Sequence, residues 1–303
     1  MLCLSRVSRK RYSPESVPCR DGRVGYGGRM TNLGEWEGGV GRSWAAEWER
    51  TDRSFAAMTP HLLRAITALP GRDIVDIGCG AGELSLGLAE GRPGARVLGI
   101  DISADLVATA TIRSQGRANC VFALADAATW QPDRGAPDLY VSRHGVMFFD
   151  DPLGAFAHLA HVAARSASLC FSCFRAPREN PWASALGELI GGGGIAPGDP
   201  HAPGPFAFAD RDYVADLLGS AGWKGIRFEP CDYRYLAGSG RDPVGDALGF
   251  FMRIGPAARA LRELPEAERA PVIARIERFL AEQSAHGEVA FPAAAWIVTA
   301  TKA

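Results

Sequence analysis

The sequence lacks any long hydrophobic run, and this absence argues against a membrane-spanning protein. None of its apolar stretches approaches the roughly 20 residues that a helix needs to cross a bilayer. An excess of one charge sign is missing as well, because the formal net charge is only −1. Nothing in the overall balance therefore favours nucleic acid or an anionic membrane as a partner. We expect a soluble protein without a membrane span.

Cysteines are few and have no disulfide framework: seven are scattered over 303 residues. An odd number without regular spacing predicts reduced thiols in a cytoplasmic protein. Cys170 and Cys173 form a C-x-x-C, but they lie in an apolar run, residues 168–174, that is typical of a strand. We interpret them as packing residues on opposite faces of that strand rather than as a redox or zinc pair.

Residues 1–29 lack both the apolar segment of a secretory signal and any helical apolar stripe. They carry seven basic residues against only Glu15 and Asp21. Two interpretations remain open. Either the segment is a disordered basic arm, or Met30 is the natural start, which we favour because organised sequence follows it directly.

The most informative stretch runs from Asp73 to Asp101. An apolar, β-prone run ends in three glycines at alternate positions, Gly78, Gly80 and Gly82, and helical apolar spacing follows. This pattern predicts a strand, a tight turn and a helix whose free N–H groups face a ligand. A second strand, residues 97–100, ends on Asp101, whose carboxylate is placed to accept hydrogen bonds from ribose hydroxyls.

The glycine spacing discriminates between nucleotides. A dinucleotide fingerprint needs glycine or alanine three residues after its second glycine, and this position is Glu83. An acid at the start of the helix also offsets the positive helix end that attracts a pyrophosphate. A nicotinamide-dependent oxidoreductase is therefore disfavoured.

Residues 76–82 resemble motif I of the class I S-adenosylmethionine (SAM) methyltransferases, acid-x-Gly-x-Gly-x-Gly. The resemblance implies SAM as the cofactor, with Asp76 at its amino-acid end and Asp101 at the ribose. It also implies that Asp126 accepts the adenine amino group, while Ile102 or Trp130 sandwiches the ring. The cofactor-binding candidates are Asp76, Gly78, Cys79, Gly80, Asp101, Ile102, Asp126, Ala127 and Ser142.

The order of strand-like and helix-like segments fits the fold of this family. We expect an α/β protein with a Rossmann-like, seven-stranded, mostly parallel sheet, helices on both faces and a final antiparallel hairpin. The predicted divisions are an N-terminal helical cap, a methyltransferase domain, and within the domain a substrate lid insert and a helical insert. Their bounds are residues 30–69, 70–303, 175–209 and 243–283.

Chemistry is expected after the fourth predicted strand, residues 137–142, because ligands of open parallel sheets bind beyond the carboxyl ends of the strands. His144 is a candidate general base there, although a lone histidine is more often structural. Arg143 is a candidate for holding a substrate carboxylate or an adjacent carbonyl. His158 and His161 have helical spacing but no third ligand, so we expect helix surface and no metal site.

Aromatic residues in the cap and in the lid insert are candidates for the substrate pocket, with packing on the core as the alternative for each. Part of the cap, which includes helical spacing from Trp44 to Phe55, is expected to cover the cofactor. The substrate-pocket candidates are Trp48, Arg53, Phe148, Trp182, Phe206 and Phe208.

The chain is most similar to the small-molecule group that includes the ubiquinone/menaquinone-type and type 11 methyltransferases. The resemblance implies methyl transfer from SAM to N, O or C of a small acceptor, mainly by positioning. A SAM-binding regulator or scaffold without transferase activity remains an alternative. A nucleic-acid methyltransferase is disfavoured, because residues 142–145 read Ser-Arg-His-Gly where an Asn/Asp-Pro-Pro-aromatic element would be expected. The sequence leaves the acceptor and the oligomeric state open.

Overall fold

The computed structural model describes residues 33–191 and 199–303. The predicted basic arm and the alternative start at Met30 lie outside the described residues, as does most of the glycine run that begins at Gly191.

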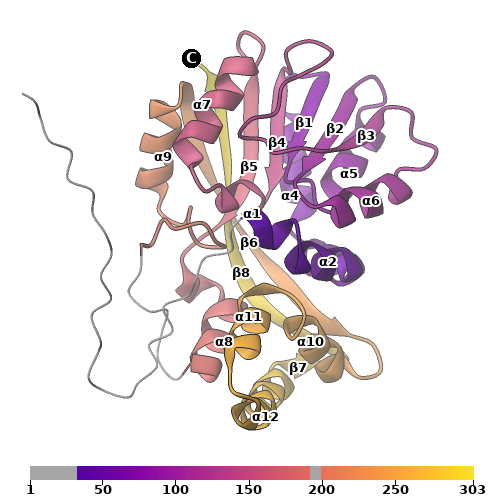
Figure 1. Ribbon diagram of the computed structural model, residues 1–303, viewed down its shortest axis with the longest axis vertical. Helices are drawn as coiled ribbons and strands as arrows, with labels where there is room; N and C mark the ends of the chain where they lie inside the picture. Colours follow the sequence, from indigo (N-terminus) through magenta and orange to yellow (C-terminus); the bar gives the residue numbers. More distant parts are fainter. Residues whose placement is uncertain (1–32, 192–198) are drawn as a thin grey trace, which may run out of the picture.

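One mixed sheet forms the centre of the molecule, with strand order β3-β2-β1-β4-β5-β8-β6 (Figure 1). Five strands are parallel: β1 (Asp73–Ile77), β2 (Arg96–Asp101), β3 (Cys120–Leu124), β4 (Leu139–Arg143) and β5 (Ser168–Phe174). Strand β8 (Glu288–Lys302) is antiparallel to both β5 and β6 (Trp223–Ser239). The predicted sheet is confirmed. A further strand, β7 (Ser284–Ala285), pairs with β8 and was not predicted, because two residues show no periodicity.

The central strands are buried along nearly their whole length, as expected for parallel strands covered by helices on both faces. Every residue of β5 is buried, including Cys170 and Cys173, which are free thiols. Burial raises the pKa of the Cys170 thiol to about 12. The packing interpretation of this C-x-x-C is therefore confirmed.

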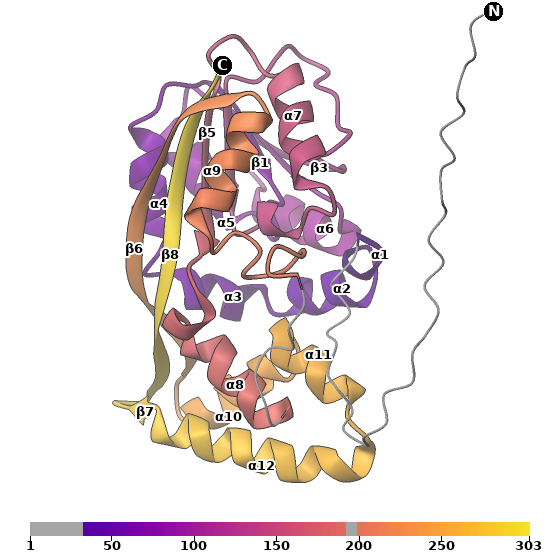
Figure 2. The same cartoon turned by 90° about the vertical axis from the view of Figure 1, so that its left-hand side faces the viewer.

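Helices α4 (Thr59–Thr67), α5 (Glu83–Gly91), α6 (Ala104–Arg113), α7 (Pro152–Val162) and α9 (Arg211–Ser220) cover the sheet (Figure 2). Ser103 caps α6 as predicted, since its hydroxyl accepts a hydrogen bond from the Leu106 N–H. Asp210 caps α9 in the same way, accepting from the N–H groups of Asp212 and Tyr213.

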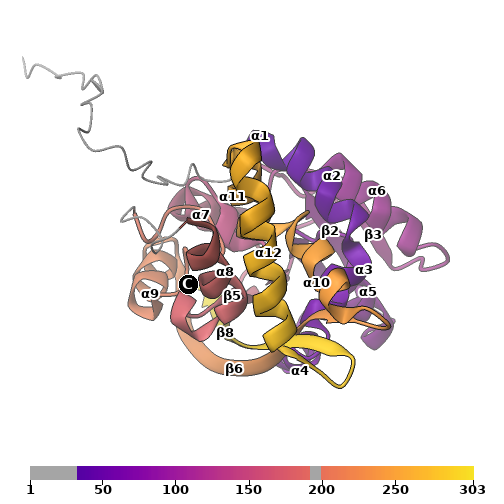
Figure 3. The ribbon, with the colours of Figure 1, turned by 90° about the horizontal axis from the view of Figure 1, so that it is seen from below.

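Strands β6 and β8 continue beyond the sheet as a two-stranded ribbon (Figure 1). Between them the chain forms α10 (Pro243–Phe251), α11 (Gly255–Glu263) and α12 (Glu266–Glu282), which lie with α8 (Pro181–Gly191) at this end of the molecule (Figure 3). The helical insert is thus present. In the extra part of β6, buried Cys231, Tyr233 and Tyr235 alternate with exposed Asp232 and Arg234, the period-2 pattern of a half-buried strand.

The N-terminal segment forms α1 (Leu33–Trp36), α2 (Gly39–Ala46) and α3 (Trp48–Phe55) before α4. The helical conformation is interrupted at Glu47, so Trp44 lies in α2 while Trp48 and Phe55 lie in α3. Figure 2 shows these helices between the sheet and the insert helices. Helix α2 approaches closely at Gly41, where a Cβ would lie 2.2 Å from the Ser103 Oγ. This placement closes one side of the space above the sheet.

Candidate functional site

The glycine turn between β1 and α5 depends on backbone conformations that favour glycine. Gly78 and Gly80 have φ angles of 62° and 57°. At Gly78 a Cβ would also lie 3.0 Å from the Gly145 Cα, because the loop after β4 rests against the turn. At Gly82 the absence of a side chain also matters for packing, since a Cβ there would lie 2.7 Å from the Phe122 ring. The first two glycines shape the ligand turn, and the third makes room for core packing.

Asp101 fixes this turn from the end of β2. Its Oδ2 accepts a hydrogen bond from the Gly80 N–H at 2.9 Å, and its Oδ1 accepts from the Ser103 N–H at 2.9 Å. Burial raises the pKa of the Asp101 carboxyl, and these two hydrogen bonds partly offset the rise. Each oxygen keeps lone pairs for a ligand hydroxyl.

Asp76 is a buried carboxyl group near the end of β1, with 1% of its surface exposed. Its Oδ2 accepts a hydrogen bond from the Ser85 hydroxyl at 2.6 Å, whereas its Oδ1 has no partner among the described residues. Burial raises the pKa of Asp76 to about 7, although the Ser85 hydroxyl acts in the opposite direction. An unpaired buried carboxylate oxygen suits a cationic ligand group.

A cavity of about 1710 Å³ opens above the turn. Ligand pockets for one small molecule usually measure about 300–1,000 Å³, so this cavity has room for a cofactor and a second molecule. Its walls come from the glycine turn, α1–α3, the loops after β4 and β5, α8, α10 and α11.

Eight of the nine cofactor-binding candidates line this cavity: Asp76, Gly78, Cys79, Gly80, Asp101, Ile102, Asp126 and Ala127. Ser142 does not. It is fully buried, donates from its hydroxyl to the Ile77 carbonyl at 2.7 Å and accepts from the Gly145 N–H at 3.2 Å. Its predicted cofactor contact is therefore wrong, and it joins β1 to the loop after β4 instead.

Trp130 is likewise not part of the cavity wall, whereas Ile102 is. The Trp130 ring packs against the core, and its carbonyl lies 2.7 Å from the His158 Nε2. His158 is consequently half-buried rather than on the helix surface, while His161 is exposed.

Arg143 lines the cavity, but its guanidinium is already neutralised. It forms ion pairs with Asp52, at 3.3 Å, and with Glu83, and it donates to the Thr59 hydroxyl at 3.0 Å. Burial lowers the pKa of Arg143, and the Asp52 carboxylate counteracts this effect. Its predicted role in holding a substrate carboxylate or an adjacent carbonyl stays a prediction, and a substrate carboxylate would have to compete with the pairs that Arg143 already forms.

Asp52 is the partner that the sequence did not reveal. It also pairs with Arg113 at 2.6 Å, and Arg113 donates to the Ala81 carbonyl in the glycine turn at 2.6 Å. The Arg113 guanidinium in turn lies over the Trp48 ring, 3.9 Å from its centroid. Asp52 thereby fastens α3 to the glycine turn and to the end of β4.

His144 lies just beyond β4 with a positive φ of 59°, an unusual backbone conformation for a non-glycine residue. Its ring stacks on Phe174 with centroids 4.1 Å apart, and the side chain is buried. Neither ring nitrogen has a hydrogen-bond partner within the described part of the chain. Burial, followed by the nearby Arg143 charge, lowers the pKa of His144 well below its usual range, so the ring stays neutral.

Four of the six substrate-pocket candidates line the cavity: Trp48, Phe148, Trp182 and Phe206. Arg53 does not, because it donates to the Ala237 carbonyl at 2.7 Å and pairs with Asp246 at 2.8 Å. Phe208 is 1% exposed and packs on Phe156 and Phe171 in the core. Both of these predictions are wrong.

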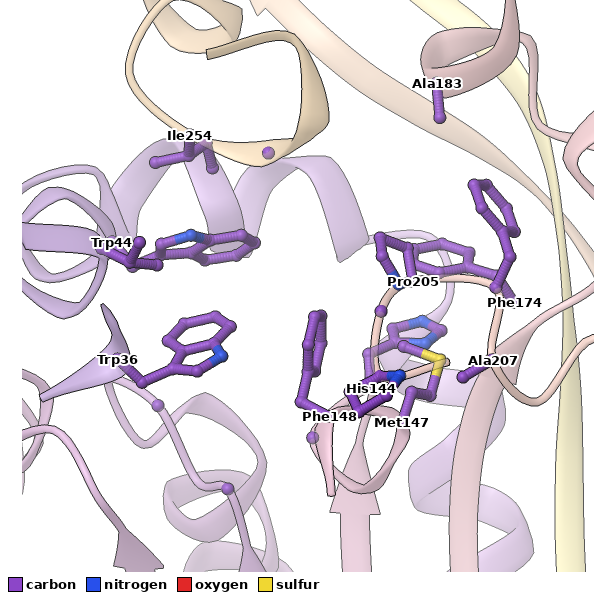
Figure 4. Close-up of a pocket in the computed structure, with 18 of the residues that line it drawn as sticks. Trp36, Trp44, His144, Met147, Phe148, Phe174, Ala183, Pro205, Ala207 and Ile254 are labelled. Atoms are coloured by element: carbon purple, nitrogen blue, oxygen red, sulfur yellow. The ribbon is translucent and has the colours of Figure 1, made fainter. Parts of the chain in front are cut away.

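The sequence missed several further wall residues, among them Trp36, Trp44 and Ile254. Figure 4 shows Trp36 and Trp44 on one side of the cavity, Phe174 and His144 on the other, and Phe148 between them. The helical spacing that begins at Trp44 was visible in the sequence, but not which face of the helix meets the cavity.

Two negative findings apply to the described residues, 33–191 and 199–303. No group of three or more His, Cys, Asp or Glu side chains is arranged there to hold a metal ion. None of the helices in those ranges is long and apolar enough to span a membrane.

Comparison with protein families matches residues 74–165 to the methyltransferase domain family. Among curated proteins, trans-aconitate 2-methyltransferase of Methylobacterium radiotolerans is 32% identical over 139 residues, which are 42% of this chain and 52% of that protein. The enzyme of the same name from Delftia acidovorans is 41% identical over 80 residues, 26% of this chain and 29% of that protein. The chain therefore spans only about half or less of the length of these relatives.

Solved structures show the same fold at low identity. The YcgJ protein from Bacillus subtilis has a TM-score of 0.52 and 15% identity, covering 80% of this chain and 97% of that one. The phosphoethanolamine N-methyltransferase 2 of Haemonchus contortus, solved with S-adenosylhomocysteine, has a TM-score of 0.51 and 14% identity, covering 86% and 56%. The strand order, the glycine turn and the matched domain agree: residues 74–165 belong to a methyltransferase domain, in a chain that has the fold of the class I SAM-dependent methyltransferases.

Proposed function

We propose that the chain transfers a methyl group from SAM to a small-molecule acceptor. The observation that carries this proposal is a single cavity in which the glycine turn and two buried carboxyl groups open onto space for a second molecule. A protein that only bound SAM would not need that additional space.

The residues of the turn fit the cofactor. The unpaired Asp76 Oδ1 suits the ammonium group of the methionyl end, and the remaining lone pairs of Asp101 suit the ribose hydroxyls. Asp126 and Ile102 line the part of the cavity that would receive the adenine ring. When bound, SAM supplies a methyl group activated on a sulfonium, so the chain needs no reactive centre of its own.

The chain contributes chiefly by positioning. Holding an acceptor in line with the transferable group is worth up to about 7–11 kcal/mol of the barrier. Aromatic side chains of the cavity orient the acceptor and exclude water, while Asp52 and Arg143 keep α3 in place over the turn. His144, neutral and without a hydrogen-bond partner in residues 33–191 and 199–303, is the candidate to receive a proton from the acceptor.

Isothermal titration with SAM and with S-adenosylhomocysteine tests the cofactor part of the proposal. We expect both to bind, and Asp101→Ala to weaken binding by about 2 kcal/mol as charged hydrogen bonds are lost. Asp105→Ala is the matched control, because Asp105 is exposed in the first turn of α6. If neither compound bound the wild-type protein, the proposal would be abandoned.

Formation of S-adenosylhomocysteine separates an enzyme from a SAM-binding regulator. We expect its production from SAM to depend on an added acceptor and to fall together with cofactor affinity in Asp101→Ala. Tight SAM binding with no product over a broad panel of acceptors would support the regulator instead.

A further inference from the structure

The part of the cavity around His144 has a continuous aromatic wall, formed by Phe174, Trp182, Phe206 and Tyr235. Phe174 lies 5.0 Å from Trp182 and 5.9 Å from Phe206 between ring centroids. Trp182 stacks on Tyr235 at 4.8 Å with an interplanar angle of 9°. Phe174, Trp182 and Tyr235 are buried and Phe206 is half-buried, so the aromatic wall gives this part of the cavity an apolar lining that favours a hydrophobic, aromatic ligand.

Most polar atoms near the aromatic wall already have hydrogen-bond partners in the protein. The Trp182 indole N–H donates to the Asn180 Oδ1 at 3.2 Å, so a ligand meets only the ring. His144 is the exception, since its ring nitrogens are buried without a partner among the described residues. Solvent does not reach these nitrogens, so contact with a ligand requires the ring to turn.

The arginines that line the cavity are poorly suited to a multiply charged anion at this place. Arg143 is paired with Asp52 and Glu83, and Arg253 is paired with Glu47 at 2.5 Å. Arg259 forms an ion pair with Glu35 at 3.3 Å. A polycarboxylate would have to compete for these cations with carboxylates that already hold them.

Two other cavity arginines, Arg178 and Arg262, are exposed. Solvent screens their charge, so among the described residues these two arginines attract an anion less strongly than a buried cation beside the aromatic wall would.

We infer that the acceptor is a planar, apolar, aromatic-bodied molecule whose hydroxyl or N–H is directed at His144, and not a polycarboxylate. This inference rests on the proposed function and names the substrate class of the same site. It departs from trans-aconitate, the compound named for the similar relatives, and the matched segments leave about half or more of those proteins uncovered.

Charge balances in such a transfer. The acceptor heteroatom bonds to the methyl carbon while the methyl–sulfur bond breaks, with its electron pair left on sulfur. The proton of the acceptor passes to a His144 nitrogen, so the positive charge of the sulfonium ends on the imidazole ring. Because the ring has turned toward the cavity for this transfer, the proton passes from it to solvent when the product leaves.

The test uses 2-naphthol, a planar bicyclic compound with one hydroxyl, beside 2-naphthoate and trans-aconitate. Each is titrated into the full chain saturated with S-adenosylhomocysteine, and methyl transfer from labelled SAM is followed separately. We expect 2-naphthol to bind and to be methylated on oxygen, 2-naphthoate to bind about ten-fold more weakly, and trans-aconitate to show no binding.

Two variants connect this result to the aromatic wall. Phe206→Ala, at a half-buried position of a loop, should weaken 2-naphthol binding about ten-fold while S-adenosylhomocysteine still binds as in the wild type. Trp296→Ala is the control, because that aromatic residue packs against Phe228 and Arg175 and is not part of the cavity wall.

Failure of 2-naphthol to bind the saturated protein would overturn the inference, as would tighter binding of trans-aconitate. Unchanged 2-naphthol affinity in Phe206→Ala would do the same. If the wild-type protein did not bind S-adenosylhomocysteine at all, the proposed function itself would be refuted. The two failures are therefore distinguishable.

Discussion

At the scale of single residues, Asp76 links cofactor binding to pH. Burial raises the pKa of its carboxyl to about 7, so the group changes from largely neutral to largely ionised between about pH 6 and pH 8. The ionised form attracts the ammonium group of SAM. We therefore predict tighter SAM binding at the higher pH, measured by isothermal titration.

Asp76→Asn is the comparison, because the amino group of SAM also titrates in a nearby range. The variant should bind more weakly at the higher pH and lose most of the pH dependence. Parallel pH profiles in the two proteins would show that Asp76 does not meet the cofactor cation.

His144 supports a second prediction at this scale. Its pKa lies well below the ordinary value of about 6.5, so the proton-accepting form persists through mildly acidic pH. We predict that His144→Gln lowers kcat about 100-fold with little change in KM, since the variant keeps a polar side chain but accepts no proton. The pH–activity profiles of the wild type and the variant should therefore not differ by an inflection at pH 6.5. A kcat within a few-fold of the wild type would leave His144 as a packing residue of the cavity.

The same shift affects folding in a defined direction. Because the folded pKa of His144 is depressed, the unfolded chain binds a proton more readily below about pH 6.5. The free energy of unfolding therefore decreases as pH falls from that value toward the folded pKa. Asp76 acts oppositely, since its raised pKa means that its buried charge costs stability as pH rises toward about 7.

At the scale of elements, the glycine turn offers a matched pair of substitutions. Gly78 and Gly80 both have positive φ, but only at Gly78 would a Cβ also contact the backbone of the loop after β4. Gly80→Ala should cost about 1 kcal/mol of stability from backbone strain, and Gly78→Ala about 2–3 kcal/mol with a larger loss of SAM affinity. Urea denaturation and isothermal titration measure the two effects. Equal losses would contradict the close approach of Gly145.

The elements that could be predicted are those whose burial is evident from the residue pattern of the element itself. Strand β5 begins and ends at the predicted residues, because its apolar run lies within the segment itself. The far ends of β6 and β8 could not be predicted locally, because they pair with each other and with the two-residue β7, and the pairing joins Ser239 to Glu288. The break at Glu47 was missed because its carboxylate is held by Arg50 and the distant Arg253.

At the scale of the whole molecule, the residues of the candidate site likewise divide into those that local sequence predicts and those that it does not. The predicted members of the glycine turn line the cavity, since spacing along the chain is enough to place them. The pairing of Arg143 was not foreseen and Arg53 was assigned wrongly, because their partners Asp52 and Asp246 lie 91 and 193 residues away in the sequence. No local pattern reveals whether a charged side chain beside a cavity is free or already paired.

Pairings of this kind join the two ends of the molecule. Asp246 of α10 forms ion pairs with Arg50 and Arg53 of α3, each at 2.8 Å, and accepts a hydrogen bond from the Ser239 N–H at 3.0 Å. Burial alone would raise the pKa of Asp246, but the Ser239 N–H and the two guanidinium groups lower it overall. The stabilisation is therefore present at neutral pH and is lost as pH falls through the depressed folded pKa.

Asp246→Asn should lower the free energy of unfolding by about 1–3 kcal/mol, because both arginines keep their charge and lose their partner. Asp73→Asn is the matched control: its pair with Arg96 is largely exposed, so little change is expected. Urea denaturation at neutral pH compares the variants, and repeating it at about pH 3.5 should shrink the difference. If both substitutions cost the same, the contact between α3 and α10 would not hold the insert helices over the cavity, and the enclosure of the site would need another cause.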